Sequence, residues 1–186
     1  MMVAGVSASA RRLLFLSGLA GVVAAIAGGA AYLLVRTISL ITSVALLGEW
    51  HWGEIPSLSE LEPSPRLPIA AVIGALVIAV IARGVPIIRG HGIPEAMEAV
   101  LRRQSRIAPR TAVAKPLSAA IAIGTGGPFG AEGPIIVTGA ALGSMVGQIV
   151  RVTPSERKIL LASGAAAGMA ATFGAPLAAL LLAVEL

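Results

Sequence analysis

Long stretches without any charged residue alternate with short polar segments along this chain of 186 residues. The charge-free stretches contain 23, 16, 16, 18 and 26 residues and are, in chain order, Leu13–Val35, Leu67–Ala82, Pro116–Ala131, Gly133–Val150 and Ile159–Val184. About 20 apolar residues are needed for a helix to cross the hydrocarbon core of a bilayer. Two stretches reach that length, and the others are short or interrupted. The pattern predicts an all-α, multi-pass integral membrane protein.

Glycine, proline and polar turns divide the apolar pattern into seven predicted helices. They cover residues 11–47, 68–83, 94–103, 110–123, 133–150, 159–172 and 176–186. The first is either one long tilted helix or a helix broken near Arg36–Thr37. Residues 151–158 are interpreted as a polar turn. The helix at 94–103 is too short to cross a bilayer.

Composition agrees with a membrane location, because 56% of residues are hydrophobic and the mean hydropathy is +0.91. The net charge of +5 indicates cytoplasmic loops and contact with anionic lipid headgroups. We expect no nucleic-acid partner, since aromatic residues are only 3% of the chain. There is no cysteine, which excludes disulfides.

Charged residues also predict an orientation in the membrane. Residues 102–115 hold four arginines and Lys115 with no acid, so we assign them to the cytoplasmic side. Residues 48–67 are acidic and carry Trp50 and Trp52, which are typical of an outer interface. The basic turn at 151–158 favours the cytoplasmic side, although that placement conflicts with some ways of threading the helices.

Glycines within the apolar stretches predict close packing between helices, because small residues let membrane helices approach each other. The glycines assigned to this use are Gly18, Gly21, Gly28, Gly29, Gly164 and Gly168.

Two segments share one design, in which a glycine-rich break is followed directly by a helix that begins with proline. They are GHGIP at 90–94 and GAEGP at 130–134. The first N–H groups of a helix have no partner within the helix and lie at the positive end of its dipole. Two such starts aimed at one point would bind an anion without a full positive charge, and so would also release it.

Glu132 lies in the second segment, in a region otherwise free of charge. An acidic residue at membrane depth is a functional candidate. Its carboxylate could occupy the anion position when ionised and leave it when protonated. The alternative is that Glu132 caps its own helix or pairs with an arginine.

These two segments, together with AAAGMAATFGAPLAALLLAVE at 165–185, resemble three motifs of the CLC chloride channel and transporter family. Lys115, placed before Glu132, also fits a lysine usual in that family. The resemblance implies broken, tilted and re-entrant helices, and a homodimer in which each subunit has its own pore and two inverted halves. Residues 1–186 would form the first half of that transport domain.

Carried over by motif, the resemblance makes Glu132 the gating glutamate. It also implies an anion path, for chloride or another small anion, whose residues are Gly90, His91, Gly92, Ile93, Pro94, Gly130, Ala131, Gly133 and Pro134. No metal and no cofactor are expected. The resemblance places the protein in the plasma (inner) membrane of a prokaryote.

Three positions depart from the family pattern. His91 replaces the usual serine or proline and either donates an N–H to the anion or turns into the packing. Ala131 replaces a basic residue. Leu186 stands where proton-coupled members carry a second glutamate, which predicts weak or absent proton coupling by the usual inner route.

The leading functional hypothesis is an anion channel or an anion/proton antiporter. The alternative is a non-conducting membrane scaffold or a truncated remnant of such a transporter. An enzyme is not expected, because the sequence contains no His/Glu/Asp or Ser/His arrangement with catalytic spacing.

Overall fold

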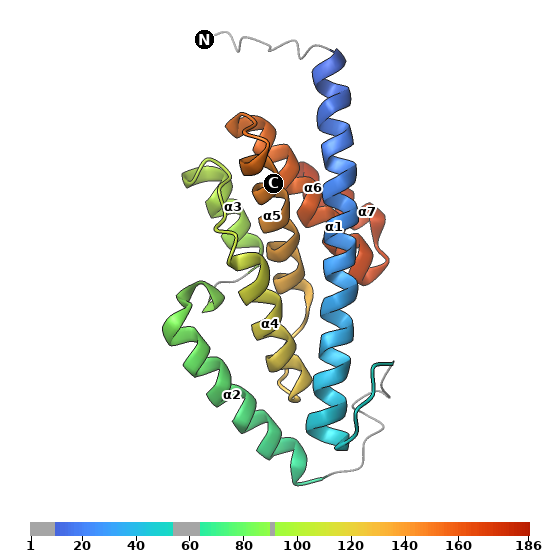
Figure 1. Ribbon diagram of the computed structural model, residues 1–186, viewed down its shortest axis with the longest axis vertical. Coiled ribbons are helices and arrows are strands. Elements are labelled where there is room, and N and C mark those ends of the chain that lie inside the picture. The colour runs from blue at the N-terminus through green and yellow to red at the C-terminus, as the bar shows by residue number, and fades with distance from the viewer. Residues whose placement is uncertain (1–9, 54–63, 90–91) are drawn as a thin grey trace.

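The computed structural model describes residues 10–53, 64–89 and 92–186, and this part of the chain is helical with no strand (Figure 1). The elements are α1 Ala10–Thr42, the π-helical turn η1 Ser43–Leu47, α2 Arg66–Gly84, the 3₁₀ turn η3 Pro86–Arg89, α3 Ile93–Arg102, α4 Thr111–Gly124, α5 Glu132–Ile149, α6 Pro154–Phe173 and α7 Pro176–Glu185. The all-α prediction is confirmed for these residues.

Helix α1 continues without a break through Arg36 and Thr37, so the alternative of a broken first helix is wrong. Its buried positions form one stripe along the helix, at Leu16, Val23, Ala27, Ala31 and Leu34. This spacing of three, four and seven residues places the stripe on one face, which packs against α4, α5 and α6. The rest of α1 exposes large apolar side chains.

Helix α6 begins at Pro154, five residues before the predicted start. Thr153 caps the helix, because its hydroxyl accepts a hydrogen bond from the N–H of Glu156, and the Glu156 carboxylate accepts one from the N–H of Thr153. This capping box, with proline at the first helical position, explains why the polar turn predicted at 151–158 is largely helical.

Glu156 also connects the start of α6 to the start of α1. Arg12 donates to its carboxylate, with an Nη2–Oε2 distance of 2.8 Å. The hydrogen bonds from Arg12 and from the Thr153 N–H hold the pKa of Glu156 at about 2. The carboxylate is therefore ionised at neutral pH, and the two helix starts remain joined by a charged contact.

The closest helix contact in the described chain is between α5 and α6, and glycine makes it possible. A methyl group added at Gly139 would lie 2.1 Å from the carbonyl oxygen of Gly164, and one added at Gly143 would lie 2.0 Å from that of Leu160. Backbone therefore packs directly on backbone, as small residues allow between membrane helices. This confirms the packing role predicted for Gly164.

The same prediction is confirmed for Gly168, which lies against Ile135, whereas three glycines of α1 do not behave as predicted. Gly18, Gly21 and Gly29 have open space where a side chain would begin. Gly28 makes only an ordinary contact, with Ala171. Glycine content alone did not distinguish packed positions from the exposed face of α1.

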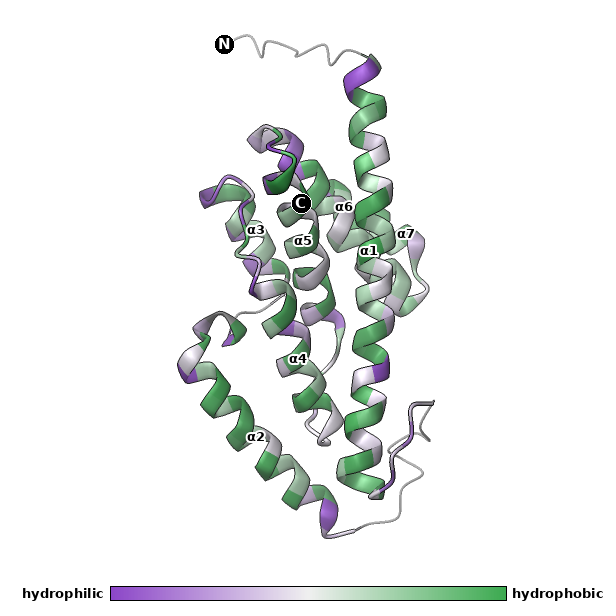
Figure 2. Ribbon diagram, viewed as in Figure 1, coloured by the Kyte–Doolittle hydropathy of each residue, from purple (hydrophilic) through white to green (hydrophobic). Residues whose placement is uncertain are grey.

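Hydrophilic residues gather at the end of the molecule where α1 begins (Figure 2). The loop between α3 and α4 and the turn between α5 and α6 lie at this same end (Figure 1). Residues 151–158 therefore lie on the same side as the basic loop that follows α3. The arrangement of the helices therefore no longer conflicts with placing residues 151–158 on the same side as the basic loop.

Candidate functional site

In the first predicted segment, Gly92 caps α3 in a conformation suited to glycine. Its φ of 59° and ψ of −112° are strained for any residue with a side chain. Pro94 follows in the first turn of the helix, and the N–H of Ala96 makes the first helical hydrogen bond, to the carbonyl of Gly92. The N–H groups of Ile93 and Glu95 precede that bond and have no partner within α3.

The second predicted segment starts α5 in the same way. Ala131 is the N-cap, Glu132 is the first helical residue, and the N–H of Ile135 bonds to the carbonyl of Ala131 at 3.0 Å. Because Pro134 has no N–H, the groups left without a helical partner are those of Glu132 and Gly133.

The fold brings these two helix starts into backbone contact. A Cβ atom added at Gly92 would lie 2.7 Å from the Cα atom of Gly133, and one added at Gly133 would lie 3.5 Å from the Cα of Gly92. Residues far apart in sequence thus meet with no side chain between them. The two helix starts that the sequence singled out therefore lie against each other through their backbones.

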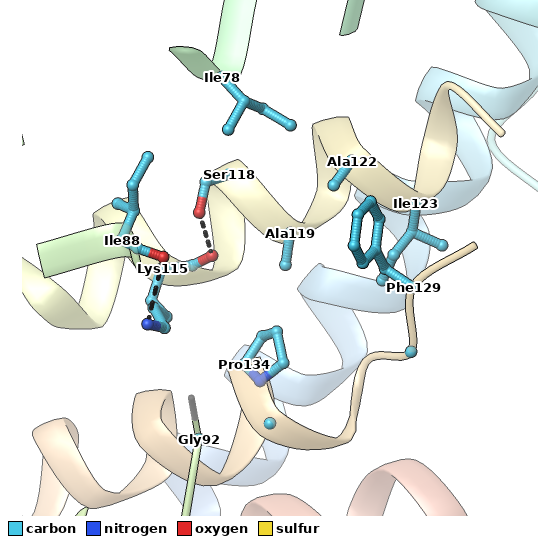
Figure 3. A pocket seen from close by; sticks show the side chains of 12 residues that line it. Ile78, Ile88, Gly92, Lys115, Ser118, Ala119, Ala122, Ile123, Phe129 and Pro134 are labelled. Atoms are coloured by element: carbon cyan, nitrogen blue, oxygen red, sulfur yellow. Dashed lines mark hydrogen bonds between the residues drawn. The ribbon is translucent and has the colours of Figure 1, made fainter. Parts of the chain in front are cut away.

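A cavity of about 400 Å³ lies beside this contact. Four of the predicted residues line it, namely Gly92, Gly130, Gly133 and Pro134. Figure 3 shows Lys115, Ser118 and Phe129 around the same space, with Ile78 and Ile88 from the α2 and η3 region. The walls are largely apolar, which strengthens electrostatic interactions inside.

The other residues predicted for the anion path are not among the described residues that line the cavity. Ile93, Pro94 and Ala131 belong to the two helix starts but do not line the cavity. Gly90 and His91 lie outside the described residues, so the role expected for the imidazole stays a prediction.

Glu132 is exposed and is not among the residues that line this cavity. Its side chain makes no cap hydrogen bond on α5, and it forms no ion pair with any described residue. Neither alternative for Glu132, a helix cap or an arginine pair, is therefore found in this part of the chain.

Lys115 lies in the cavity wall, buried within α4, with a side chain only 4% exposed. Its ammonium donates to the Glu95 carboxylate at 2.9 Å and to the carbonyl of Ile88 at 3.3 Å (Figure 3 shows the second bond). Lys115 lies within the helix predicted at 110–123, and its ammonium is paired inside the protein. It ties α4 to α3 and η3.

The ion pair between Lys115 and Glu95 changes the charge expected at the site, which sequence analysis took to be free of full positive charges. The cavity holds one full positive charge, but that charge is compensated by Glu95 from the first turn of α3. Sequence analysis did not anticipate this partner for Lys115. The only sequence signal was a lone lysine inside an otherwise apolar helix.

Replacing Lys115 with methionine is expected to lower the free energy of unfolding by about 3–5 kcal/mol, because a mostly buried carboxylate loses its counter-charge. The measurement is thermal unfolding of the complete protein in detergent. The matched control is Arg103→Met, which breaks the exposed pair with Glu98 and should cost about 0–1 kcal/mol. Adding Glu95→Gln to Lys115→Met should recover most of the loss. Equal effects of the two single variants would contradict this account of the pair.

Comparison with known proteins agrees with these motifs. The sequence pattern of the family described as voltage gated chloride channel matches residues 73–186, which is more than half of the chain. The chain belongs to this family. The matched region contains both helix starts, the residues that line the cavity beside them, and Lys115.

Curated relatives in the voltage gated chloride channel family are named H(+)/Cl(−) exchange transporter ClcA. The protein from Vibrio vulnificus (strain YJ016) is 37% identical over 177 residues, which cover 92% of this chain and 36% of the relative. That from Vibrio parahaemolyticus is 39% identical over 142 residues, or 74% of this chain and 29% of the relative. The protein from Cronobacter sakazakii is 33% identical over 174 residues, which cover 93% of this chain and 36% of the relative. This chain thus spans about a third of these relatives, which are transporters and not enzymes.

Proposed function

We propose that the complete protein containing this chain transports chloride and other small anions across a membrane. The anion path passes the starts of α3 and α5, and Glu132 gates it. The observation that carries this proposal is the backbone contact between Gly92 and Gly133, which sets two helix starts with unpaired N–H groups beside one cavity. Partial charges of this kind attract an anion and still allow its release.

The membrane placement is supported by two helical segments. Ala10–Leu47 and Arg66–Gly84 are long and apolar enough to cross a bilayer. Helix α1 alone has 33 residues, so it is about 50 Å long and exceeds a core of about 30 Å, which it can cross tilted or with one end extending beyond the core. Large apolar side chains along α2 are exposed and would face lipid: Ile69, Val72, Ile73, Leu76, Val77 and Val80.

We assign the end of the molecule where α1 begins to the cytoplasm, since cytoplasmic loops carry an excess of Arg and Lys. Because the relatives are bacterial, the membrane is the inner membrane of a prokaryote. The homodimer, the inverted second half and the assignment of residues 1–186 to one half of a transport domain belong to this same proposal.

Coupling to protons is expected to be weak. The relatives named above are H(+)/Cl(−) exchangers, which favours an exchange mechanism for this chain. Leu186, however, is buried in the core cluster and has no group that can hold a proton. Glu132 can take up a proton at the anion path, but the inner step lacks the usual acid.

Chloride efflux from liposomes that contain the complete protein should exceed efflux from empty liposomes severalfold, and potassium should not leak through the protein. Under a chloride gradient, proton uptake should be small compared with chloride movement. Cation leakage or no chloride flux would contradict the transport proposal. Robust uphill proton movement would contradict only the weak proton coupling that we infer from Leu186. The proposal of chloride transport would still stand.

A further inference from the structure

A second cavity lies away from the two helix starts, at the end of the molecule where α1 begins. It has a volume of about 490 Å³ and is lined by Arg106, Gln148, Arg151, Val152, Pro154 and Arg157. Arg106 comes from the loop after α3, Arg151 from the turn after α5, and Arg157 from the first turn of α6. Three arginines from three places in the chain therefore line one space.

Arg157 is buried, with only 4% of its surface exposed. Its two terminal nitrogens donate to backbone carbonyls, at 3.0 Å to Gln104 and 3.2 Å to Val152. Its Nε is buried without a hydrogen-bond partner. Burial, followed by the nearby charge of Arg106, lowers the pKa of Arg157. A buried cation next to a like charge is costly unless an anion compensates it.

No described acidic residue supplies that anion. Glu156 is next to Arg157 in sequence, but its carboxylate accepts from Arg12 and from the Thr153 N–H. Glu98 pairs with Arg103. Within the described ranges, Arg106, Arg151 and Arg157 form no ion pair. The cavity thus keeps an excess of three positive charges.

We propose that this cavity binds a phosphate group, carried by a lipid headgroup or present as free phosphate. Guanidinium groups match the oxygens of phosphate with paired, charge-assisted hydrogen bonds. The cavity also lies at the start of α6, whose dipole favours an anion. Its volume falls within the range of about 300–1,000 Å³ usual for small-molecule sites. The turn between α5 and α6 and the loop after α3 would then be held together by the ligand.

The test uses the complete protein in detergent and follows its unfolding temperature as inorganic phosphate is added at constant ionic strength, with sodium sulfamate as the balancing salt. A ligand that binds the folded state raises this temperature, and the concentration dependence gives its dissociation constant. A second arm adds a soluble short-chain phosphatidic acid, below its micelle concentration, against phosphatidylcholine of the same chain length.

The key variant is Arg106→Gln/Arg151→Gln, because both side chains are exposed and their loss leaves the buried Arg157 in place. It should weaken phosphate binding at least about tenfold, as expected for lost charged hydrogen bonds. The matched control is Arg102→Gln, an exposed arginine at the end of α3 that does not line the cavity. This control should bind phosphate as the wild type does.

The two arms identify the source of the phosphate. Tighter binding of phosphatidic acid than of inorganic phosphate indicates a lipid headgroup, and equal or weaker binding indicates free phosphate. Either result supports the proposed phosphate site if the double variant Arg106→Gln/Arg151→Gln loses the observed binding. The proposal is overturned if neither compound raises the unfolding temperature, or if the double variant and Arg102→Gln behave alike. None of these outcomes depends on chloride transport.

Discussion

Replacing Glu132 with glutamine is expected to remove the pH dependence of chloride transport while chloride movement persists. Glu132 is the first residue of α5, next to the glycine that contacts Gly92. In the proposed mechanism, an ionised carboxylate there would compete with the anion for the same N–H donors. Glutamine keeps the size of the side chain and removes its charge, so it imitates the protonated, open state at every pH.

The measurement is chloride efflux from liposomes at two pH values, such as about 5 and 7.5. Wild-type protein should conduct faster at the lower pH, whereas the ratio of the two rates should be close to one for Glu132→Gln. Any coupled proton movement should disappear as well. This is the largest functional effect that we expect from a single substitution.

The control for this experiment is Glu98→Gln in α3. Glu98 is exposed, pairs with Arg103 at 3.0 Å, and lies beyond the first N–H groups of its helix. Its replacement should leave the pH response of the wild type intact. If Glu132→Gln retained the wild-type response instead, Glu132 would not be the gate.

Replacing Gly139 with alanine is expected to cause a large loss of stability. The added methyl carbon would lie 2.1 Å from the backbone oxygen of Gly164, a distance that real contacts do not reach. The obstacle is backbone, which cannot rotate away as a side chain can. Helices α5 and α6 would have to separate over their whole contact, so we expect a loss of about 3 kcal/mol or more.

The measurement is thermal unfolding of the complete protein in detergent, together with size-exclusion chromatography to follow loss of the folded form. Gly18→Ala is the matched control, because open space surrounds that position in α1. It should be neutral or slightly stabilising, by up to about 1 kcal/mol, since alanine favours a helix. Similar losses for both variants would show that the contact between α5 and α6 is not the cause.

Local sequence signals predicted most helix boundaries of this chain to within a few residues. The apolar stretch between Arg66 and Arg83 predicted α2, and proline after glycine predicted the starts of α3 and α5. These signals are local because proline and glycine act on the backbone at their own positions. The start of α6 was also present locally, in the sequence TPSE at 153–156, but its capping box was overlooked.

The sequence by itself therefore determined the helical class, the places where helices break, and the position of Glu132 at a helix start. Only the tertiary structure decided which breaks meet. Gly92 and Gly133 touch because α3 and α5 pack together, and no periodicity connects residues so far apart. The same holds for Lys115, which the sequence placed in the helix at 110–123 without indicating that packing brings it beside Glu95. Burial depends on neighbours from elsewhere in the chain, so a pattern read along one helix cannot supply it.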